Sequence, residues 1–377
     1  MFKVVGIDTY LGCHIFNTLK FGFMSNLDIT LHRYVFYVYK FILLFCEDNK
    51  NIDITAIIHA LIVNIGASFI SLQHLKPQDN MLSVLIPVKN FDCSKLIKEL
   101  HKQGEVLDCP YEIIVAEDGT DSGMLQLNAL ADKLDNCRRI VNNINIGRAA
   151  IRNLLASEAK YRNLVFIDCD AVVEKEDFLK AYADTLKENR VVCGGLYHAD
   201  ILPNAECTLR YRYEKEADKT RDAQTRSKAP YDRFTSFNFA IDKELFNSIL
   251  FDTSITKYGY EDVLFGKELE KRGIEILHIE NRLLHSGLES NAAFLAKTEQ
   301  ALETLVTIEE KITNTPLLDT ANKLNSRHLT WLFMAYWKCC RRCLKRNLLG
   351  SSPSLFKFNI YKLGYYISLR QQKQGHK

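Results

Sequence analysis

The sequence predicts an α/β protein with a mostly parallel, doubly wound sheet flanked by helices. Between residues 82 and 315, short apolar runs typical of buried strands alternate with segments that have the apolar spacing of an amphipathic helix. Repeated strand–helix units imply parallel strands, because each helix returns the chain across the sheet. The 377 residues are 47% hydrophobic and 25% charged, which suffices for a large core and excludes bulk disorder.

The first strand–helix unit begins with the apolar run from Leu82 to Val88. Asp92 to Ser94 can then cap a helix that has Leu96, Ile97 and Leu100 on its inner face. Three more units follow, with expected strands at 111–116, 138–141 and 164–167 and expected helices at 121–134, 149–160 and 175–187. These units form the regular half of the predicted sheet.

From residue 190 the alternation of strands and helices loosens. We expect strands ending at Gly195, at 234–241 and at 275–279, and helices at 205–217, 261–272 and 291–312. A charged loop at 219–233 lies between them, and loops of that length inside a domain are usually functional or mobile. The second half of the region is therefore predicted to be less regular than the first.

Three acidic pairs stand out in this framework: Glu117-Asp118, Asp168-Cys169-Asp170 and Glu261-Asp262. The first two directly follow predicted strands, and in an α/β fold ligands bind where strands end. Two carboxylates one residue apart can hold a hard divalent cation of the kind that a nucleotide diphosphate needs. A single pair of this kind is often only a surface turn, but the order and spacing of all three indicate a site.

Several segments carry a resemblance to a known family. On the nucleotide side they are Leu82 to Asn90, Glu117 to Ser122, Asn145 to Arg148 with Arg152-Asn153, and Asp168 to Asp170. In this order they resemble the motifs of family 2 glycosyltransferases with the GT-A fold. Phe237 to Ala240 and Gly259 to Val263 resemble the acceptor-side motif of galactosyl- and N-acetylgalactosaminyltransferase domains, in which Gly-Gly-Glu-Asp is usual. Tyr260 replaces the second glycine, which bears on backbone shape and acceptor preference.

The resemblance implies a metal-dependent inverting glycosyltransferase. Such an enzyme would move a hexose or N-acetylhexosamine from a nucleotide sugar, with UDP the first choice of nucleotide, to a glycan or lipid-linked acceptor. By the same resemblance, residues 81–196 would form the nucleotide-sugar-binding half and residues 197–315 the acceptor-side half. Polysaccharide biosynthesis would be the setting.

On the donor side, the resemblance implies nucleotide contacts from Pro87, Glu117, Asp118, Arg148 and Asp168. A carboxylate after the second strand, above all Asp118, can accept the imide N–H of a uracil-type base. Asp168 would contact the ribose or the metal. Arg148 opens a predicted helix just after a glycine and can pair with a phosphate, although an ion pair on the helix surface is nearly as good an explanation.

The resemblance also implies metal and acceptor residues. Asp170 and His285 are expected to ligate Mn²⁺ or Mg²⁺, which would stabilise the leaving diphosphate, although a lone histidine such as His285 is more often structural. An inverting transfer needs a general base for the acceptor hydroxyl, and Asp262 is the candidate. Glu261 and Asn238 are expected to bind the acceptor.

The N-terminal 80 residues carry none of these motifs. Residues 54–72 are uncharged for nineteen positions, close to the length of a membrane span, but a buried or interfacial helix explains them equally well. No signal-peptide pattern is present. Met81 stands directly before the first strand, so an enzyme of this kind could naturally begin there.

Residues 316–377 form a basic tail with no acidic residue after Asp319. A helix over 327–349 would place basic residues on one face and apolar residues on the other, which suits an anionic membrane surface. The alternative is a basic helix docked on its own catalytic domain, and nucleic acid is not an expected partner. Eleven cysteines without a framework spacing favour reduced thiols. We therefore expect a cytoplasmic protein, with peripheral attachment to the cytoplasmic face of the membrane if the basic helix binds there.

Two other functions stay open from sequence. A sugar-phosphate nucleotidyltransferase also uses a nucleotide-binding α/β sheet and a metal, but it needs a glycine-rich phosphate loop, and residues 88–92 contain no glycine. A non-catalytic sugar- or nucleotide-binding accessory protein would not need a base at Asp262. Both are less favoured than the transferase.

Overall fold

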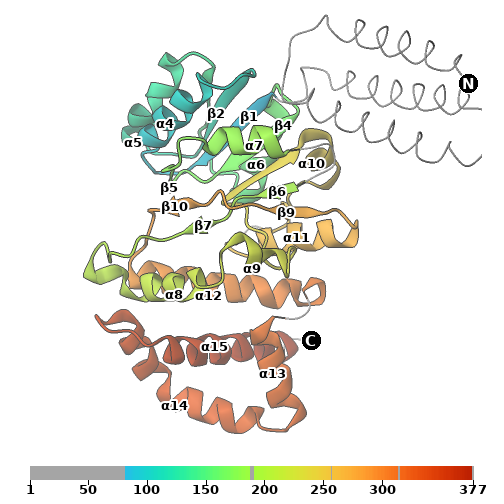
Figure 1. Cartoon of the computed structure of the whole chain (residues 1–377). Helices are drawn as coiled ribbons and strands as arrows, with labels where there is room; N and C mark the ends of the chain where they lie inside the picture. Colours follow the sequence, from blue (N-terminus) through green and yellow to red (C-terminus); the bar gives the residue numbers. More distant parts are fainter. Residues whose placement is uncertain (1–80, 187–190, 256, 313–314, 376–377) are drawn as a thin grey trace, which may run out of the picture. The chain divides into compact units, whose positions relative to one another are not determined.

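The computed structural model describes residues 81–186, 191–255, 257–312 and 315–375 (Figure 1). All of them belong to one folded unit that spans residues 76–377. The expectations for residues 1–80, including the uncharged stretch 54–72, lie outside the described residues.

Within the described residues, seven strands form the main sheet in the order β3-β2-β1-β4-β8-β6-β9. They are β1 (Leu82–Val88), β2 (Tyr111–Asp118), β3 (Cys137–Asn142), β4 (Asn163–Ile167), β6 (Val191–Cys193), β8 (Asn238–Asp242) and β9 (Ile276–His278). Only β8 runs antiparallel to its neighbours, β4 and β6, in this part of the chain. The predicted fold class, a mostly parallel sheet flanked by helices, is confirmed.

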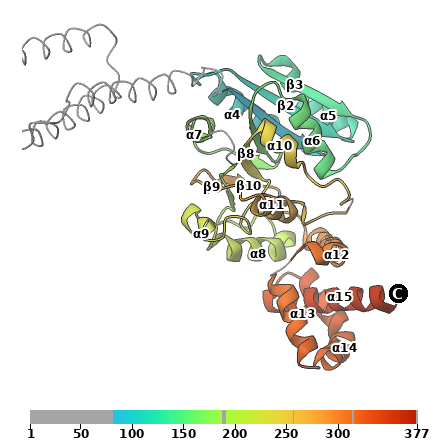
Figure 2. The ribbon, with the colours of Figure 1, turned by 90° about the vertical axis from the view of Figure 1, so that its right-hand side faces the viewer.

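Helices cover both faces of the main sheet (Figure 2). They are α4 (Ser94–Gly104), α5 (Ser122–Asn128), α6 (Arg148–Glu158), α7 (Phe178–Thr185), α10 (Lys243–Ile249) and α11 (Glu261–Lys271). Successive side chains of β1 point to opposite faces: Val84 packs in the core with α4 and α7, whereas Leu85 packs with α6, α10 and α11. The sheet is therefore buried on both sides, as its continuous apolar strands require.

The predicted helix 121–134 is shorter than expected. It ends at Asn128 and continues as the 3₁₀ turn η2 (Ala129–Lys133). The fully buried Asn128 side chain donates to the Phe91 carbonyl and to Glu117 and accepts from the Cys93 amide. These contacts tie the helix end to the start of α4.

A second, three-stranded sheet was not predicted. It has the order β5-β10-β7, from β5 (Ala171–Val172), β7 (Leu196–Tyr197) and β10 (Leu283–His285). Figure 1 shows it between the main sheet and α8 (Thr208–Asp218). The expected charged loop at 219–233 contains a short helix, α9 (Ala223–Ser227). The small sheet brings the end of β4, where Asp170 lies, beside the end of β10.

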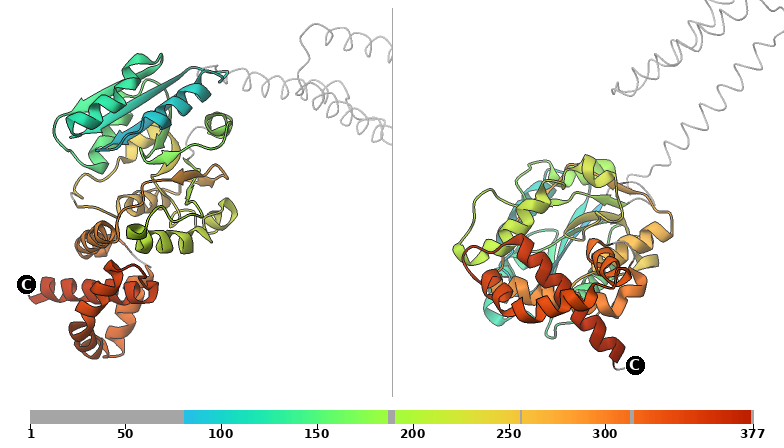
Figure 3. Two further views of the ribbon diagram at one scale, coloured as in Figure 1. Left: turned by 90° about the vertical axis from the view of Figure 1, so that its left-hand side faces the viewer. Right: turned by 90° about the horizontal axis from the view of Figure 1, so that it is seen from below.

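The C-terminal part is helical, with α12 (Asn291–Ile308) followed by α13 (Pro316–Ser326), α14 (Thr330–Leu349) and α15 (Leu355–Gly375). Two 3₁₀ turns remain: η3 (Ala205–Cys207) precedes α8, and η4 (Glu309–Lys311) follows α12. A third core joins α8 and α12 to these tail helices (Figure 3). Trp337 of α14 is buried there, and α15 approaches it so closely that a side chain at Gly364 would collide with the indole. No helix in the described ranges combines the length and apolar composition that crossing a bilayer requires.

The packing of α14 changes the expectation for the tail. Trp337, Leu344 and Leu348, which were predicted to face a membrane, are buried in the third core. The structure therefore has the alternative arrangement, in which the basic helix is docked on its own protein. Its exposed side is a different one and includes Trp331, Leu332 and Tyr336.

Candidate active site

A cavity of about 900 Å³ opens at the carboxyl ends of β1, β2 and β4. The predicted residues that line it are Pro87, Asp118, Arg148, Asp168, Asp170 and Glu261. The loop after α10, the Gly287–Glu289 segment and Lys297 and Gln300 of α12 complete the wall. The site thus combines elements from both halves of the α/β region.

Asp118 shapes the first wall of the cavity. Its carboxylate accepts hydrogen bonds from the backbone amides of Ile146 at 2.6 Å and Gly147 at 3.0 Å. Gly147 has φ 92°, a conformation that side chains disfavour, and α6 begins at the next residue, Arg148. Asp118 therefore fixes the turn that aims the start of α6 at the cavity.

Glu117 and Asn238 are inside the protein rather than on the cavity wall. Glu117 is fully buried and accepts a hydrogen bond from Asn128. Asn238 is also fully buried; it accepts from the Tyr182 hydroxyl at 2.6 Å and donates to two backbone carbonyls, those of Gly195 and Asn281. All hydrogen-bonding groups of the Asn238 side chain are occupied inside the protein, which favours a structural role over the acceptor contact expected from the sequence. The burial of Glu117 likewise argues against a contact between Glu117 and the nucleotide.

Arg148 links the acidic groups of the two halves. Its Nε lies 2.6 Å from Oε1 of Glu261, and its Nη2 lies 3.3 Å from Oδ2 of Asp168. The buried Arg152 binds the other oxygen of Asp168. Burial raises the pKa of Glu261, but the charges of Arg148 and Arg152 and the hydrogen bonds to its carboxylate together hold that pKa below its ordinary value. Arg148 thus makes the ion pairs that were the alternative to a phosphate contact.

Asp170 and His285 meet across the small sheet. β5 and β10 are antiparallel with Ala171 opposite His285, so Oδ2 of Asp170 lies 2.9 Å from Nε2 of His285. The Ser286 amide and hydroxyl both donate to the Asp170 carbonyl, at 3.0 and 2.8 Å. A side chain at Gly287 would collide with the Asp170 carboxylate, so the glycine keeps the space beside it open. The contact joins residues 115 positions apart in sequence.

This pair fits a divalent cation. A carboxylate oxygen and an imidazole nitrogen are suitable ligands for Mn²⁺ or Mg²⁺, and two adjacent ligands of an octahedral ion at about 2.1 Å would lie about 3 Å apart. Among the described residues, no group of three or more His, Cys, Asp and Glu side chains has metal-binding spacing. The protein would therefore supply few ligands here, and Mg²⁺-type ions commonly complete their coordination with substrate phosphates and water.

Asp262 lies at the start of α11 and is partly buried. Its Oδ2 accepts from the Ser236 amide at 3.1 Å, whereas Oδ1 is buried with no hydrogen-bond partner in the described part of the chain. Burial, and then the neighbouring charge of Glu261, raise the pKa of Asp262. Asp262 is next to the cavity-lining Glu261 but is itself not among the lining residues. A carboxylate with a raised pKa is a stronger base than an ordinary one once ionised.

The backbone before Glu261 explains the departure from the family motif. Tyr260 has φ 69°, a left-handed conformation in which glycine is usual, and it directly precedes α11. Tyr260 keeps the glycine-like turn although it carries a side chain, which packs against the third core. The replacement therefore preserves the backbone shape and ties the turn to the tail helices.

The sequence did not reveal several wall residues. Lys297 of α12 lines the cavity, contacts Glu289 and lies 5.3 Å from the ring of Tyr258. The guanidinium of Arg148 lies 5.8 Å from the same ring. The spacing of α12 predicts only an amphipathic helix, so nothing in the local pattern distinguishes Lys297 from a surface lysine.

The comparisons with known proteins identify the family that part of the chain matches. Residues 83–250 match the model of the family Glycosyl transferase family 2. Chondroitin synthase from Pasteurella multocida (strain Pm70) is 23% identical over 235 residues, which cover 53% of this chain and 24% of the relative. The chain thus spans about a quarter of the length of the curated relative it matches.

Two solved structures are similar to this chain. The mannosyltransferase PcManGT from Pyrobaculum calidifontis, in complex with GDP-Man and Mn²⁺, has a TM-score of 0.48 and 12% identity, with 84% of this chain and 98% of that chain covered. S. aureus TarS in complex with UDP has a TM-score of 0.41 and 16% identity, with 79% and 92% covered.

The family match defines the class of the domain over residues 83–250: it is a glycosyltransferase domain. Residues 83–250 belong to glycosyltransferase family 2.

Proposed function

We propose that this glycosyltransferase is metal-dependent and inverting, and that it moves a hexose or N-acetylhexosamine from a UDP-sugar to a glycan or lipid-linked acceptor. The observation that carries the proposal is the Asp170–His285 pair, 2.9 Å apart, at the edge of a cavity that Asp118 and Arg148 also line. The transfer needs a pocket for the nucleobase and a counter-charge for the diphosphate, which these residues and their cation can supply. It also needs a general base for the acceptor hydroxyl, for which Asp262 is the candidate.

In this proposal the donor lies along the cavity wall. Pro87 and Asp118 border the nucleotide, with Asp168 on the ribose side. Asp170 and His285 would hold Mn²⁺ or Mg²⁺, which when bound neutralises the developing charge of the diphosphate. Arg148 is already paired with Glu261 and Asp168, so it reaches a phosphate only by exchanging one of these partners.

The acceptor reacts from the opposite side. Its hydroxyl oxygen attacks the anomeric carbon, the bond from that carbon to the diphosphate oxygen breaks, and Asp262 takes the hydroxyl proton. The unpartnered Oδ1 of Asp262 is the oxygen available for that proton, provided that the site opens enough to admit the hydroxyl. Glu261, at the cavity wall, would orient the acceptor.

Two further parts of the proposal concern partners. The name of the relative, chondroitin synthase, supports a glycan acceptor and a place in polysaccharide biosynthesis. The exposed aromatic and basic side chains of α14 support attachment to an anionic membrane surface, on the cytoplasmic face, where a lipid-linked acceptor is found.

The test is a panel of nucleotide sugars, with nucleotide release measured in Mn²⁺, Mg²⁺ or chelator. We expect release from a UDP-hexose or UDP-N-acetylhexosamine that chelator abolishes. Asp170→Ala should remove nearly all transfer without a change in melting temperature, whereas Asp319→Ala, an exposed carboxylate on α13, should behave like wild type.

Other results of the same panel would overturn parts of the proposal. Undiminished transfer by Asp170→Ala or in chelator would exclude the metal assignment. Release of pyrophosphate from a nucleoside triphosphate and a sugar phosphate would identify a nucleotidyltransferase. Donor binding without turnover on any acceptor would identify an accessory protein.

A further inference from the structure

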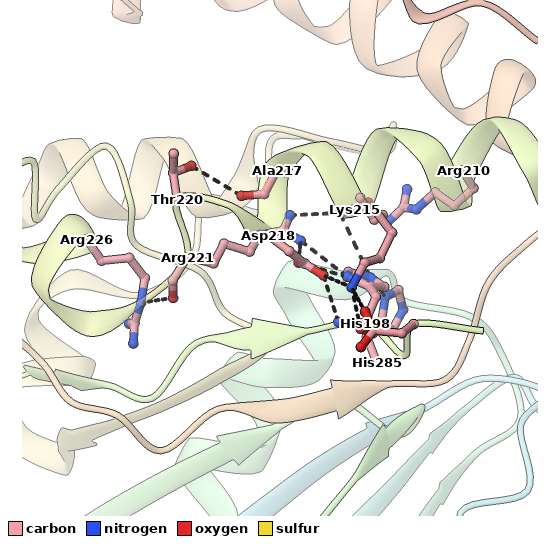
Figure 4. A network of polar contacts seen from close by, with 11 residues as sticks. His198, Arg210, Lys215, Ala217, Asp218, Thr220, Arg221, Arg226 and His285 are labelled. Atoms are coloured by element: carbon pink, nitrogen blue, oxygen red, sulfur yellow. Dashed lines mark hydrogen bonds and ion pairs between the residues drawn. The ribbon is translucent and has the colours of Figure 1, made fainter. Parts of the chain in front are cut away.

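A chain of polar contacts leads from His285, the partner of Asp170, to α8. Figure 4 shows His285, His198 and Asp218 in this chain. Nδ1 of His285 lies 2.9 Å from Nε2 of His198, and Nδ1 of His198 lies 3.1 Å from Oδ1 of Asp218. The backbone amide of His198 also donates to Oδ2 of Asp218, at 3.0 Å. His198 is only 2% exposed, so water competes little for these contacts.

The fold assembles these residues from separate segments. β7 and β10 are parallel neighbours in which Tyr197 pairs with Leu284, so His198 and His285 are the next residues along the two strands. Their rings lie 5.0 Å apart in an edge-on arrangement, and Phe237 packs edge-on against His285 at 5.1 Å. The imidazole of His285 is therefore held on two sides.

The partners decide which ring nitrogens carry protons. A carboxylate only accepts hydrogen bonds, so Nδ1 of His198 donates to Asp218. In a neutral imidazole the other nitrogen is an acceptor, so Nε2 of His198 accepts from Nδ1 of His285. With a divalent cation beside Asp170, His285 would keep this tautomer and direct the lone pair of Nε2 at the cation. The cation would take the place of a proton between Nε2 of His285 and the Asp170 carboxylate.

The charges around His198 agree with its neutral form. Nη1 of Arg221 lies 3.4 Å from Nδ1 of His198 and 2.8 Å from Oδ1 of Asp218, so a positive charge already balances that carboxylate. Glu214 lies 3.9 Å from Nε2 of His198, but it is itself paired with Arg210 and Arg221, at 2.7 and 2.8 Å. The acidic groups near His198 thus have arginine partners of their own.

We propose that His198 and Asp218 are positioning residues that hold His285 in the tautomer whose Nε2 is available to the divalent cation. The inference rests on the proposed metal-dependent function and deepens it. Ligating histidines commonly donate their other ring N–H to a partner, and loss of that partner typically lowers metal affinity by roughly 10–100-fold. Here the partner is a second histidine, His198, and its own orientation is fixed by the Asp218 carboxylate at the end of α8.

The test measures cation binding rather than turnover. The full-length protein is titrated with Mn²⁺, with and without UDP, and the free ion is recorded by electron paramagnetic resonance. His198→Leu removes the acceptor and should weaken Mn²⁺ binding by roughly 10–100-fold. His198→Gln should recover much of the affinity, because a side-chain amide oxygen can accept from Nδ1 of His285.

A matched control lies on the same helix. Glu216 is exposed and pairs with Lys219 at 2.6 Å. Glu216→Gln should therefore bind Mn²⁺ like wild type. Asp218→Asn keeps one acceptor oxygen for His198 and should weaken binding less than His198→Leu does. Melting temperatures of all variants show that they are folded.

The outcomes separate the inference from the proposed function. Wild-type affinity in folded His198→Leu would overturn the positioning role and leave the metal-dependent function standing. Equal losses of Mn²⁺ affinity in His198→Leu, His198→Gln and Glu216→Gln would indicate a general disturbance of α8 and would also overturn the positioning role. If the wild-type protein binds no Mn²⁺ with or without UDP, both the positioning role and the metal-dependent function are wrong.

Discussion

Asp262 combines a raised pKa with a carboxylate oxygen that is buried without a hydrogen-bond partner in the described part of the chain. If it is the general base, Asp262→Asn should lower kcat by roughly 10²–10⁴-fold and leave donor affinity unchanged. The raised pKa of Asp262 also predicts that wild-type kcat falls on the acid side, as the base takes up a proton at a higher pH than an ordinary aspartate would.

Steady-state kinetics across pH and a donor-binding titration check this prediction. Glu270→Gln, an exposed substitution on the same helix, is the control and should have no effect on kcat. Loss of donor binding together with turnover would show that Asp262 belongs to the donor site or to the structure, and that the base lies elsewhere.

His278 offers a prediction about stability. Its Nε2 donates to the Pro230 carbonyl at 3.0 Å, and its Nδ1 accepts from Arg226 at 2.7 Å, so the ring must be neutral. Burial, together with the charge of Arg226, lowers its pKa to about 4. The folded state therefore resists a proton that the unfolded chain accepts near pH 6.5. The stability that depends on neutral His278 is complete above about pH 6.5 and is lost as pH falls toward 4.

Urea unfolding of wild type and His278→Gln at several pH values measures this effect. The free energy of unfolding should favour wild type at pH 7, and the difference should narrow by roughly 2 kcal/mol on approaching pH 4. Parallel pH dependence of the two proteins would contradict a neutral, buried His278.

Sequence reasoning located residues next to strong strand signals and missed those that depend on distant contacts. Asp118 and Asp170 follow long apolar runs, so their place at the cavity was predictable. His198 follows a strand of only two residues and meets a partner 87 positions away, which no local pattern indicates. For Asn238 the motif predicts an acceptor contact, whereas in the structure its buried amide donates to two backbone carbonyls, which the sequence did not indicate.

At the scale of elements, the four regular strand–helix units of the first half were predicted from the sequence. In each unit, a strand-like run is followed by a segment with the apolar spacing of an amphipathic helix. The strands β5, β7 and β10 have two or three residues each, too few for periodicity to show. The reversed direction of β8 is not visible in its sequence either, since direction is set by the connection and not by the strand residues.

We predict that helix α14 binds anionic membranes through its exposed basic side chains. Lys338, Arg342 and Arg346 are exposed on it, whereas Lys345 is paired with Glu299 at 3.1 Å. Reversing these three exposed charges to Glu should abolish binding to anionic vesicles and spare transfer to a soluble acceptor. Wild-type binding should weaken with salt, because exposed charges are screened over about 10 Å at 0.1 M.

Vesicle sedimentation at low and high salt measures this binding. The control reverses three exposed lysines of α4, Lys95, Lys98 and Lys102, which changes the net charge equally at another place. Equal losses in both proteins would indicate a general charge effect. If wild type ignores anionic vesicles at low salt, the peripheral membrane assignment fails.

At the scale of the whole molecule, two truncations should behave differently. A protein that starts at Met81 contains every element of the described unit and should fold and transfer sugar. A protein that stops at Ile312 lacks α13, α14 and α15, and so exposes apolar residues of α12 such as Leu302 and Leu305. It should be insoluble or unfold at a much lower temperature.

Thermal unfolding and solubility compare the two proteins with the full chain. An inactive or insoluble protein from Met81 would make the preceding residues part of the working enzyme. A shortened protein that stops at Ile312 and melts like the full chain would show that the tail core adds little to stability.

Helix α8 takes part in two regions at once. Leu209, near its start, is fully buried in the core shared with the tail helices, and Asp218, at its end, holds His198. Arg212, between them, donates to the Pro353 carbonyl just before α15. Thermodynamic linkage then makes the two regions reciprocal: a ligand that strengthens cation binding by shifting α8 must itself bind more tightly when the cation is present, by the same factor. The packing of the tail helices and the binding of the cation would then affect each other through α8.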